Sequence, residues 1–220
     1  MEKDFFVVIN NCANLLLLVV FIYITFLSIK NKNILLLKLL SVYTGIAIVI
    51  NLLNELNYYK IIEVKIIYGW IFFSFIHLGI LLWVIEQEIS KVLKLLKIKF
   101  FFWVSILVQF LFCLFDLVKK TYYSATFSNL IIIGFSILFY FILFKGSVLI
   151  NLKNHVGFIL INGIFLSTCL ILPIILFGNH IKVSMNSSDY FLVASIGPFA
   201  SILLYSFFLK TAACIRKSII

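Results

Sequence analysis

Two residues able to do polar chemistry, Gln109 and Asp116, lie inside the otherwise apolar stretch WVSILVQFLFCLFDLVKK at residues 103–120. With Ser105 and Cys113 they follow the spacing i, i+4, i+8 and i+11. At 3.6 residues per turn, this spacing puts the four side chains within about 80° of one another on a helix. An ionisable group inside a membrane span normally faces the interior of a bundle or a watery cavity. The spacing therefore predicts a polar face that is turned toward other helices.

Similar polar faces recur in other apolar stretches, and His77 lies deepest among them. A histidine titrates near physiological pH and both of its ring nitrogens form hydrogen bonds, so it suits proton sensing, anion binding or proton relay. We expect the polar faces to meet in an outward-opening vestibule with His77 at its floor. The residues predicted to bind a ligand there are His77, Gln109, Asp116, Glu55, Asn14, Asn51, Asn129 and Ser74.

A purely structural role is the alternative for the same residues. Interhelical hydrogen bonds from Asn, Gln, Ser and His commonly hold membrane bundles together, at about 0.6–2 kcal/mol each. Glu55 and Asp116 also lie close enough to the ends of their stretches to reach water. The sequence leaves both roles open.

The composition predicts an integral membrane protein. Hydrophobic residues make up 64% of the 220-residue chain and charged residues 12%, whereas soluble domains are typically about 45–50% apolar and about 25% charged. Helices satisfy their own backbone hydrogen bonds in lipid, and runs such as LLLLVVFIYITFL lack the alternation of a membrane β-barrel. The fold class expected is an all-α integral membrane protein.

Seven stretches are long enough to span a hydrocarbon core of about 30 Å. The connections between them are too short to fold alone, so residues 1–220 are expected to form a single transmembrane domain. The first stretch lacks a basic n-region and an A-x-A site, so we expect it to stay in the mature protein. The predicted spans are 6–28, 34–54, 66–86, 100–118, 127–146, 156–178 and 190–209.

The distribution of Lys and Arg predicts the orientation. With seven spans, twelve of the 18 positive residues fall on the side of the C-terminus and six on the side of the N-terminus. Cytoplasmic loops carry the excess of Lys and Arg, so the N-terminus is expected outside and the C-terminus in the cytoplasm. Of the 18 positive residues, 17 are Lys, and they lie in short tracts between the apolar stretches. We therefore expect the net charge of +10 to reflect contacts with anionic lipid headgroups and not with nucleic acid.

Helix breakers predict where the bundle bends. Pro173 falls in the sixth stretch, and Gly197 and Pro198 fall in the seventh. Proline removes one helical hydrogen bond and usually kinks the axis. Kinks are therefore expected in the last two spans.

No catalytic motif stands out. The spans carry no paired Asp, no H-E-x-x-H and no glycine-rich phosphate loop, and the three histidines fall at different depths, so neither an enzyme, a metal site nor a cofactor is predicted. The four cysteines show no C-x-x-C spacing and are expected to behave as small apolar residues. The sequence leaves a disulfide bridge between Cys12 and Cys113 as an alternative, because both residues should lie toward the same side of the membrane.

Three segments carry a resemblance to a known group of proteins: FSFIHLG in the third span, FSNLIIIGFSILFYFILFK in the fifth and FILINGIFLS in the sixth. In these and in the order of its spans, the chain resembles small uncharacterised bacterial seven-span integral membrane proteins. The resemblance implies a seven-helix fold and a place in the bacterial cytoplasmic membrane. In that group the position of His77 is commonly acidic, and no catalytic residue is carried over.

These observations predict a sensor or receptor-like module. Its outer polar pocket would bind a ligand, and its basic inner surface would meet a membrane or cytoplasmic signalling protein, since helix movement can shift a two-state equilibrium. One alternative is a small-solute or proton-coupled transporter, or a subunit of one. The other is a structural subunit of a membrane assembly.

Overall fold

The computed structural model describes residues 2–32, 34–58, 66–92, 96–119, 121, 123–145, 155–184 and 187–219, nearly all of them in helices. The helices are long because uninterrupted apolar runs favour the one backbone form that satisfies its own hydrogen bonds in lipid. Their bounds are α1 (Glu2–Lys30), α2 (Leu35–Tyr58), α3 (Ile66–Val92), α4 (Leu96–Lys119), α5 (Tyr123–Lys145), α6 (Val156–Ser184), α7 (Ser187–Ala194) and α8 (Ile196–Ile219).

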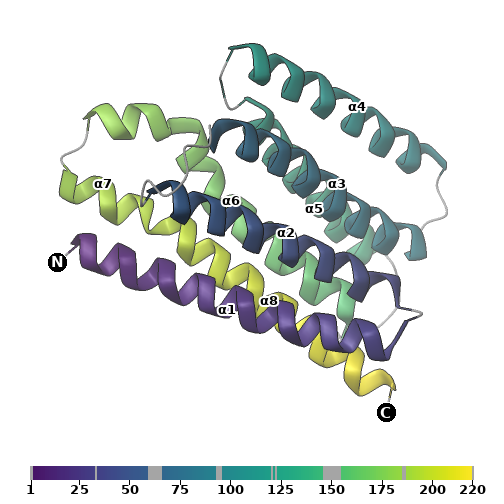
Figure 1. The fold of residues 1–220 in the computed structure, drawn as a ribbon. Coiled ribbons are helices and arrows are strands. Elements are labelled where there is room, and N and C mark those ends of the chain that lie inside the picture. Colours follow the sequence, from purple (N-terminus) through teal and green to yellow (C-terminus); the bar gives the residue numbers. More distant parts are fainter. Residues whose placement is uncertain are drawn as a thin grey trace.

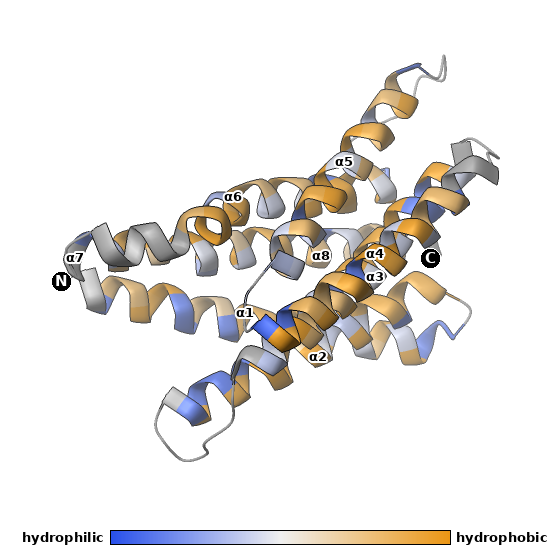
Figure 2. Cartoon of the chain, turned by 90° about the horizontal axis from the view of Figure 1, so that it is seen from above, coloured by the Kyte–Doolittle hydropathy of each residue, from blue (hydrophilic) through white to orange (hydrophobic). Residues whose placement is uncertain are grey.

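Seven segments of the described chain are long and apolar enough to cross a membrane. By length and composition this agrees with the predicted number of spans, and hydrophobic residues cover most of each long helix in Figure 2. Most of the predicted ends agree with these segments within four residues. The exception is the seventh span, which was predicted to end at 209 and continues as an apolar helix to Lys217. Lys210 lies inside that helix with its side chain exposed, as a long basic side chain can when its head reaches the interface.

Six of the helices form a closed ring. In order around it, α1 contacts α2, α2 contacts α3, α3 contacts α5, α5 contacts α6, α6 contacts α8, and α8 returns to α1. Helix α4 stands outside the ring and packs against α3 and α5 (Figure 1). The two termini lie at opposite ends of the bundle, as an odd number of crossings requires (Figure 1).

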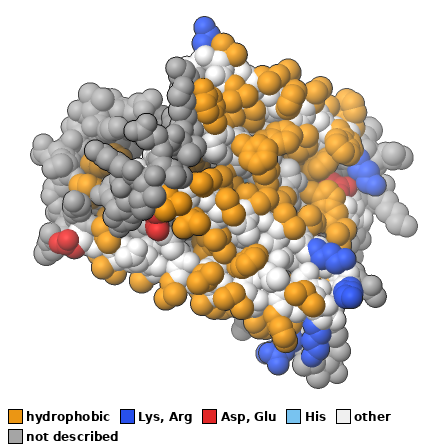
Figure 3. Space-filling model, viewed as in Figure 1, with side chains coloured by type: hydrophobic (Ala, Val, Ile, Leu, Met, Phe, Trp, Pro, Cys, Tyr) orange, Lys and Arg blue, Asp and Glu red, His pale blue; other side chains and the backbone are white. Residues whose placement is uncertain are grey.

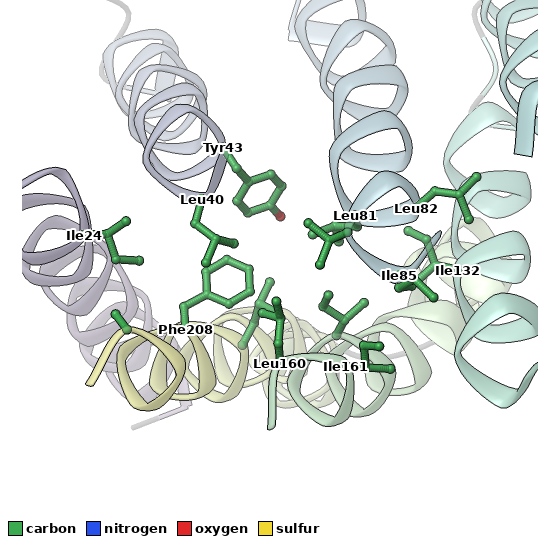
Figure 4. Packing of buried hydrophobic residues seen from close by; sticks show 14 of the residues in the cluster. Ile24, Leu40, Tyr43, Leu81, Leu82, Ile85, Ile132, Leu160, Ile161 and Phe208 are labelled. Atoms are coloured by element: carbon green, nitrogen blue, oxygen red, sulfur yellow. The ribbon is translucent and has the colours of Figure 1, made fainter. Parts of the chain in front are cut away.

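The centre of the ring is filled by apolar side chains. Figure 4 shows residues from α1, α2, α3, α5, α6 and α8 pointing toward one another. Leu40, Leu81, Leu160, Ile161 and Phe208 are each completely buried there. Contacts of this kind supply the van der Waals attraction that holds membrane helices together.

The close approach of α6 and α8 explains why residue 163 is a glycine. A Cβ atom added at Gly163 of α6 would clash with the side chain of Phe207 on α8. Small residues at such crossings let membrane helices come into direct backbone contact. Gly163 therefore fixes the tight packing between α6 and α8.

The seventh span breaks where proline was expected to bend it. The helix is interrupted at Ser195, between α7 and α8, three residues before Pro198. Pro198 has no N–H to offer the carbonyl of Ala194, and its ring crowds that turn. Ser195 bridges the break, because its backbone N–H donates to the carbonyl of Phe191 (3.1 Å) and its carbonyl accepts from Phe199 N (3.1 Å). Pro173, in contrast, lies within the continuous helix α6.

Candidate functional site

The polar face of the fourth span turns inward, as its spacing predicted. The exposed fractions of Ser105, Gln109, Cys113 and Asp116 are 8%, 0%, 7% and 0%. On the opposite face of α4, Trp103 and Leu107 are 67% and 61% exposed. The inward face contacts α3 and α5, so its polar groups meet those of two neighbouring helices.

The Asp116 carboxylate accepts hydrogen bonds from the first residues of α5. Its Oδ2 accepts a hydrogen bond from Ser124 N (2.7 Å), and its Oδ1 accepts bonds from Tyr123 N (3.1 Å) and from the Thr121 hydroxyl (2.5 Å). The first N–H groups of a helix lack internal partners, and a carboxylate there also meets the positive end of the helix dipole. Asp116 thus holds the turn between α4 and α5, which accounts for a carboxylate in so apolar a span.

Gln109 lies in a small polar cluster about two turns of α4 before Asp116. Its Nε2 donates to Ser74 Oγ on α3 (3.3 Å) and lies 3.7 Å from Cys113 Sγ. Ser74 donates to the carbonyl of Ile71 (2.8 Å) and lies 3.2 Å from Ser124 Oγ on α5. The cluster therefore joins α3, α4 and α5.

One buried atom of this cluster has no hydrogen-bond partner in the described residues. Gln109 Oε1 is buried and has no hydrogen-bond partner among the residues that the structure describes. An unsatisfied buried acceptor costs about 1–3 kcal/mol. Among the described residues of the predicted site, it is the buried side-chain atom that lacks a hydrogen-bond partner.

A second polar cluster joins α1 and α2 at the end of the bundle where the N-terminus lies. Asn14 Nδ2 donates to Glu55 Oε1 (2.7 Å), and Asn51 Nδ2 donates to Asn14 Oδ1 (3.0 Å). The three side chains form a chain of hydrogen bonds in which the carboxylate is the final acceptor. Three of the residues predicted from the sequence are thus brought together.

His77 stands apart from both clusters. Its Nδ1 shares a hydrogen bond of 2.9 Å with the hydroxyl of Tyr43, which joins α3 to α2. The rings of Phe73 and Tyr43 lie beside the imidazole, with centroids 5.8 Å away in each case. Phe208 of α8 packs edge-on against Tyr43 at 5.7 Å. His77 is therefore held in an aromatic setting at the edge of the apolar centre.

Asn129, the last of the eight residues, bonds within its own helix. Its Nδ2 donates to the carbonyl of Ala125, one turn earlier in α5, at 2.7 Å. The predicted site residues therefore divide into separate groups: Asn14, Asn51 and Glu55; Ser74, Gln109 and Asp116; His77 with Tyr43; and Asn129. Each group joins neighbouring helices or a single turn.

Two grooves lie on the surface of the described part of the chain, and none of the eight residues lines either of them. The larger runs over α1, α2 and α3, and the smaller lies between α4 and α5, beside Ser105 and Gly134. Both are lined mainly by apolar side chains. The grooves and the polar clusters are thus different features of the molecule.

Several polar contacts were not predicted from the sequence. The Tyr140 hydroxyl donates to Asn162 Oδ1 (2.6 Å) and joins α5 to α6, and Thr25 and Ser41 share a bond of 2.7 Å between α1 and α2. Tyr43 was missed as well, since nothing in a single sequence pairs it with His77. A spacing rule finds polar residues within one helix but not the residue across the interface.

The end of α3 carries two buried carboxylates that were also missed as a pair. Glu86 accepts hydrogen bonds from Ser90 Oγ (2.8 Å) and from Gln87 Nε2 (3.0 Å). Glu88 lies against Gly157 in the first turn of α6, where an added Cβ would clash with its carboxylate. A carboxylate at this place faces the positive end of the α6 dipole. The feature of the sequence that could have indicated this pair is the EQE triplet at residues 86–88, at the end of the predicted third span.

The cysteines and histidines form no shared site in the described residues. Cys12, Cys113, Cys169 and Cys214 are all free thiols, so Cys12 and Cys113 are not bridged in this structure. Among the residues described, no group of three or more His, Cys, Asp and Glu side chains is placed to hold a metal ion.

Comparisons of the chain with protein-family models, with curated proteins and with solved structures find no match. The resemblance to small bacterial seven-span membrane proteins stays a prediction.

Proposed function

We propose that this protein is a sensor or receptor-like module of the bacterial cytoplasmic membrane that signals through a partner protein. The observation that carries the proposal is the packed centre of the helix ring, where Leu40, Leu81, Leu160 and Phe208 are each completely buried. A transporter that moved solute through the ring would need polar or hollow space there. A packed bundle suits a change of helix position better than the passage of a solute.

The polar contacts support this kind of movement. Several of them join two or three neighbouring helices, as Tyr43 and His77 join α2 and α3. A buried hydrogen bond has a few discrete arrangements, and coupling between distant sites needs elements with two such states. A ligand that binds one arrangement better than the other would shift the equilibrium by its difference in affinity.

The orientation is part of the proposal, with the N-terminus outside and the C-terminus in the cytoplasm. Eight described Lys and Arg side chains belong to the end of the bundle at which α1 ends and α8 ends: Lys30, Lys32, Lys38, Lys99, Lys145, Lys210, Arg216 and Lys217. At the opposite end the described basic side chain is Lys119. Figure 3 shows several of the basic side chains gathered near the α1–α2 turn. Such an excess marks the cytoplasmic side.

The basic end is where we expect a partner to bind. Arg216 and Lys217 are exposed on the last turns of α8, and α8 passes through the core beside Tyr43 by way of Phe208. A shift between α2 and α3 therefore has a physical route to the C-terminal helix.

Photo-crosslinking in living cells tests the signalling proposal. A photoreactive amino acid at Arg216 should give one discrete protein adduct, and one at Phe5, at the other end of the bundle, should not. Because Tyr43→Phe removes the bond to His77, it should change the yield of the Arg216 adduct at least twofold. Tyr68→Phe is the matched control, since Tyr68 is exposed at 40%.

The alternatives predict different results. A structural subunit of an assembly would give an Arg216 adduct whose yield Tyr43→Phe leaves unchanged. A transporter would produce solute or proton flux in proteoliposomes above the level of empty vesicles, and His77→Ala would abolish it. Either result would overturn the sensor proposal.

A further inference from the structure

The larger groove follows the outer face of α2. It is lined by Val42, Gly45 and Val49 of that helix, by Phe21 of α1 and by Phe72 of α3. Gly45 lets the Phe21 ring lie close to α2, since an added Cβ would lie 3.1 Å from that ring. The groove encloses about 640 Å³ and is open toward the surroundings of the bundle.

The groove has the length of one lipid leaflet. It runs along α2 from Ser41 to Leu53, which at 1.5 Å per residue is about 18 Å. Half of a hydrocarbon core is about 15 Å. An acyl chain would therefore lie in it along its whole length, whereas a partner helix that spans the membrane would extend well beyond it.

A positive charge stands at one end of the groove. Lys38 is exposed and lies one turn before Val42, so Lys38, Val42, Gly45 and Val49 share one face of α2 at the spacing i, i+4, i+7 and i+11. Lys30 and Lys32, also exposed, lie at the turn that leads from α1 into α2. Lys38 is thus the positive side chain in line with the groove, and Lys30 and Lys32 add positive charge at the same end of the bundle.

The acidic residues near this end do not cancel that charge at the surface. Glu86 and Glu88 of α3 are only 4% and 5% exposed, and Glu86 is bonded to Ser90 and Gln87. Figure 3 shows hydrophobic side chains across the face that α1, α2 and α3 present, with Lys and Arg at the end near the α1–α2 turn. An apolar groove with a positive charge at one end is complementary to a lipid with a negative headgroup.

We propose that this groove binds an anionic phospholipid, with one acyl chain lying over Gly45 and the headgroup phosphate contacting Lys38. The proposal does not depend on the sensor function, because the groove and the lysines are features of the surface alone. Phosphate and ammonium groups attract each other at the membrane surface by about 1 kcal/mol per Lys, which corresponds to about a fivefold change in affinity.

Native mass spectrometry of the purified full chain in detergent tests the proposal. Phosphatidylglycerol should bind at least fivefold more tightly than phosphatidylcholine with the same acyl chains. Lys38→Gln should weaken phosphatidylglycerol binding about fivefold and phosphatidylcholine binding by less, because the choline cation offsets the charge of its phosphate. Lys145→Gln is the matched control, because Lys145 is exposed at the same end of the bundle but lies on α5, beyond α3.

Blocking the groove provides a second test that needs no change of charge. Val49 is 54% exposed, so Val49→Trp should fill the groove without disturbing the core, and it should reduce phosphatidylglycerol binding at least tenfold. Leu107→Trp, at a site on α4 that is 61% exposed, should leave binding unchanged. The melting temperatures of both variants report whether they fold.

Three outcomes would overturn the proposal. Equal losses in Lys38→Gln and Lys145→Gln would mean that the lipid follows net charge and not this site. Unchanged binding in folded Val49→Trp would mean that the acyl chain lies elsewhere. If phosphatidylcholine bound as tightly as phosphatidylglycerol, the groove would recognise an acyl chain and not a lipid with a negative headgroup.

Discussion

At the scale of the residue, the carboxylate of Asp116 is explained by the helix that follows it. It accepts three hydrogen bonds, two of them from backbone N–H groups of α5. The spacing of the fourth span predicted that this face turns inward, because an apolar helix has one energetically acceptable direction for a carboxylate. The partners could not be predicted, since they depend on how the chain turns between α4 and α5.

Asp116→Asn should therefore destabilise the protein although the side chain keeps its shape. One oxygen becomes an NH₂ group that faces donors, and a buried donor left unpaired costs about 1–3 kcal/mol. Unfolding of purified protein in increasing SDS measures the difference. Asp189→Asn, at an exposed position of α7, should change the free energy of unfolding far less, and equal effects of the two would contradict the role given to Asp116.

Gln109→Leu should leave the free energy of unfolding nearly unchanged or raise it. The substitution removes the buried acceptor Oε1, which has no partner in the described structure, and it keeps a similar volume. It also removes the long bond to Ser74 Oγ (3.3 Å), but Ser74 keeps its contacts with Ile71 O and Ser124 Oγ, so little is lost in exchange for the unsatisfied acceptor. We expect the free energy of unfolding to stay within about 1 kcal/mol of the parent or to rise. A loss of 3 kcal/mol or more would show that Gln109 holds the bundle together.

At the scale of the element, the predicted helices were confirmed because the apolar runs leave the backbone no other partner in lipid. The errors lie at helix ends. α5 begins at Tyr123, before the predicted 127, because Asp116 satisfies its first N–H groups. α8 continues beyond 209 because Lys210 extends its charged head outward while the helix keeps burying Thr211, Ala212 and Ile215.

The helix packing itself could not be predicted from the sequence. The order of the ring, the position of α4 outside it and the pairing of Tyr43 with His77 all depend on contacts between helices far apart in the chain. The sequence identified which faces are polar, and the structure distributes those faces among separate interfaces. A period within one helix carries no information about its neighbour.

Gly163→Ala tests the tightest of these interfaces. The added methyl group would clash with Phe207, and overpacking of this kind costs about 1–3 kcal/mol. Gly134→Ala is the matched control, because a Cβ at Gly134 meets nothing within 4 Å, and it should be neutral or stabilise α5 by up to about 1 kcal/mol. SDS unfolding of both variants would contradict the packing of α6 on α8 if Gly163→Ala proved as stable as Gly134→Ala.

At the scale of the whole molecule, the charge distribution makes a prediction about topology. With the basic end in the cytoplasm, alkaline phosphatase fused after Ile220 should be inactive, and a green fluorescent protein at the same place should be fluorescent. The same reporters fused after Lys119, at the opposite end of the bundle, should give the reverse pattern. An active phosphatase at the C-terminus would invert the orientation.

The central claim is that the ring of helices is packed shut by apolar side chains and leaves no water path through its centre. Cysteine accessibility tests it most directly, in a variant whose four native cysteines are replaced by alanine. Single cysteines at Leu81 and Leu160, both completely buried, should resist a membrane-impermeant thiol reagent applied from either side, while one at the exposed Lys217 should react fully. Rapid labelling at position 81 or 160 in a folded protein would contradict the packed centre, and the sensor proposal that rests on it would fail.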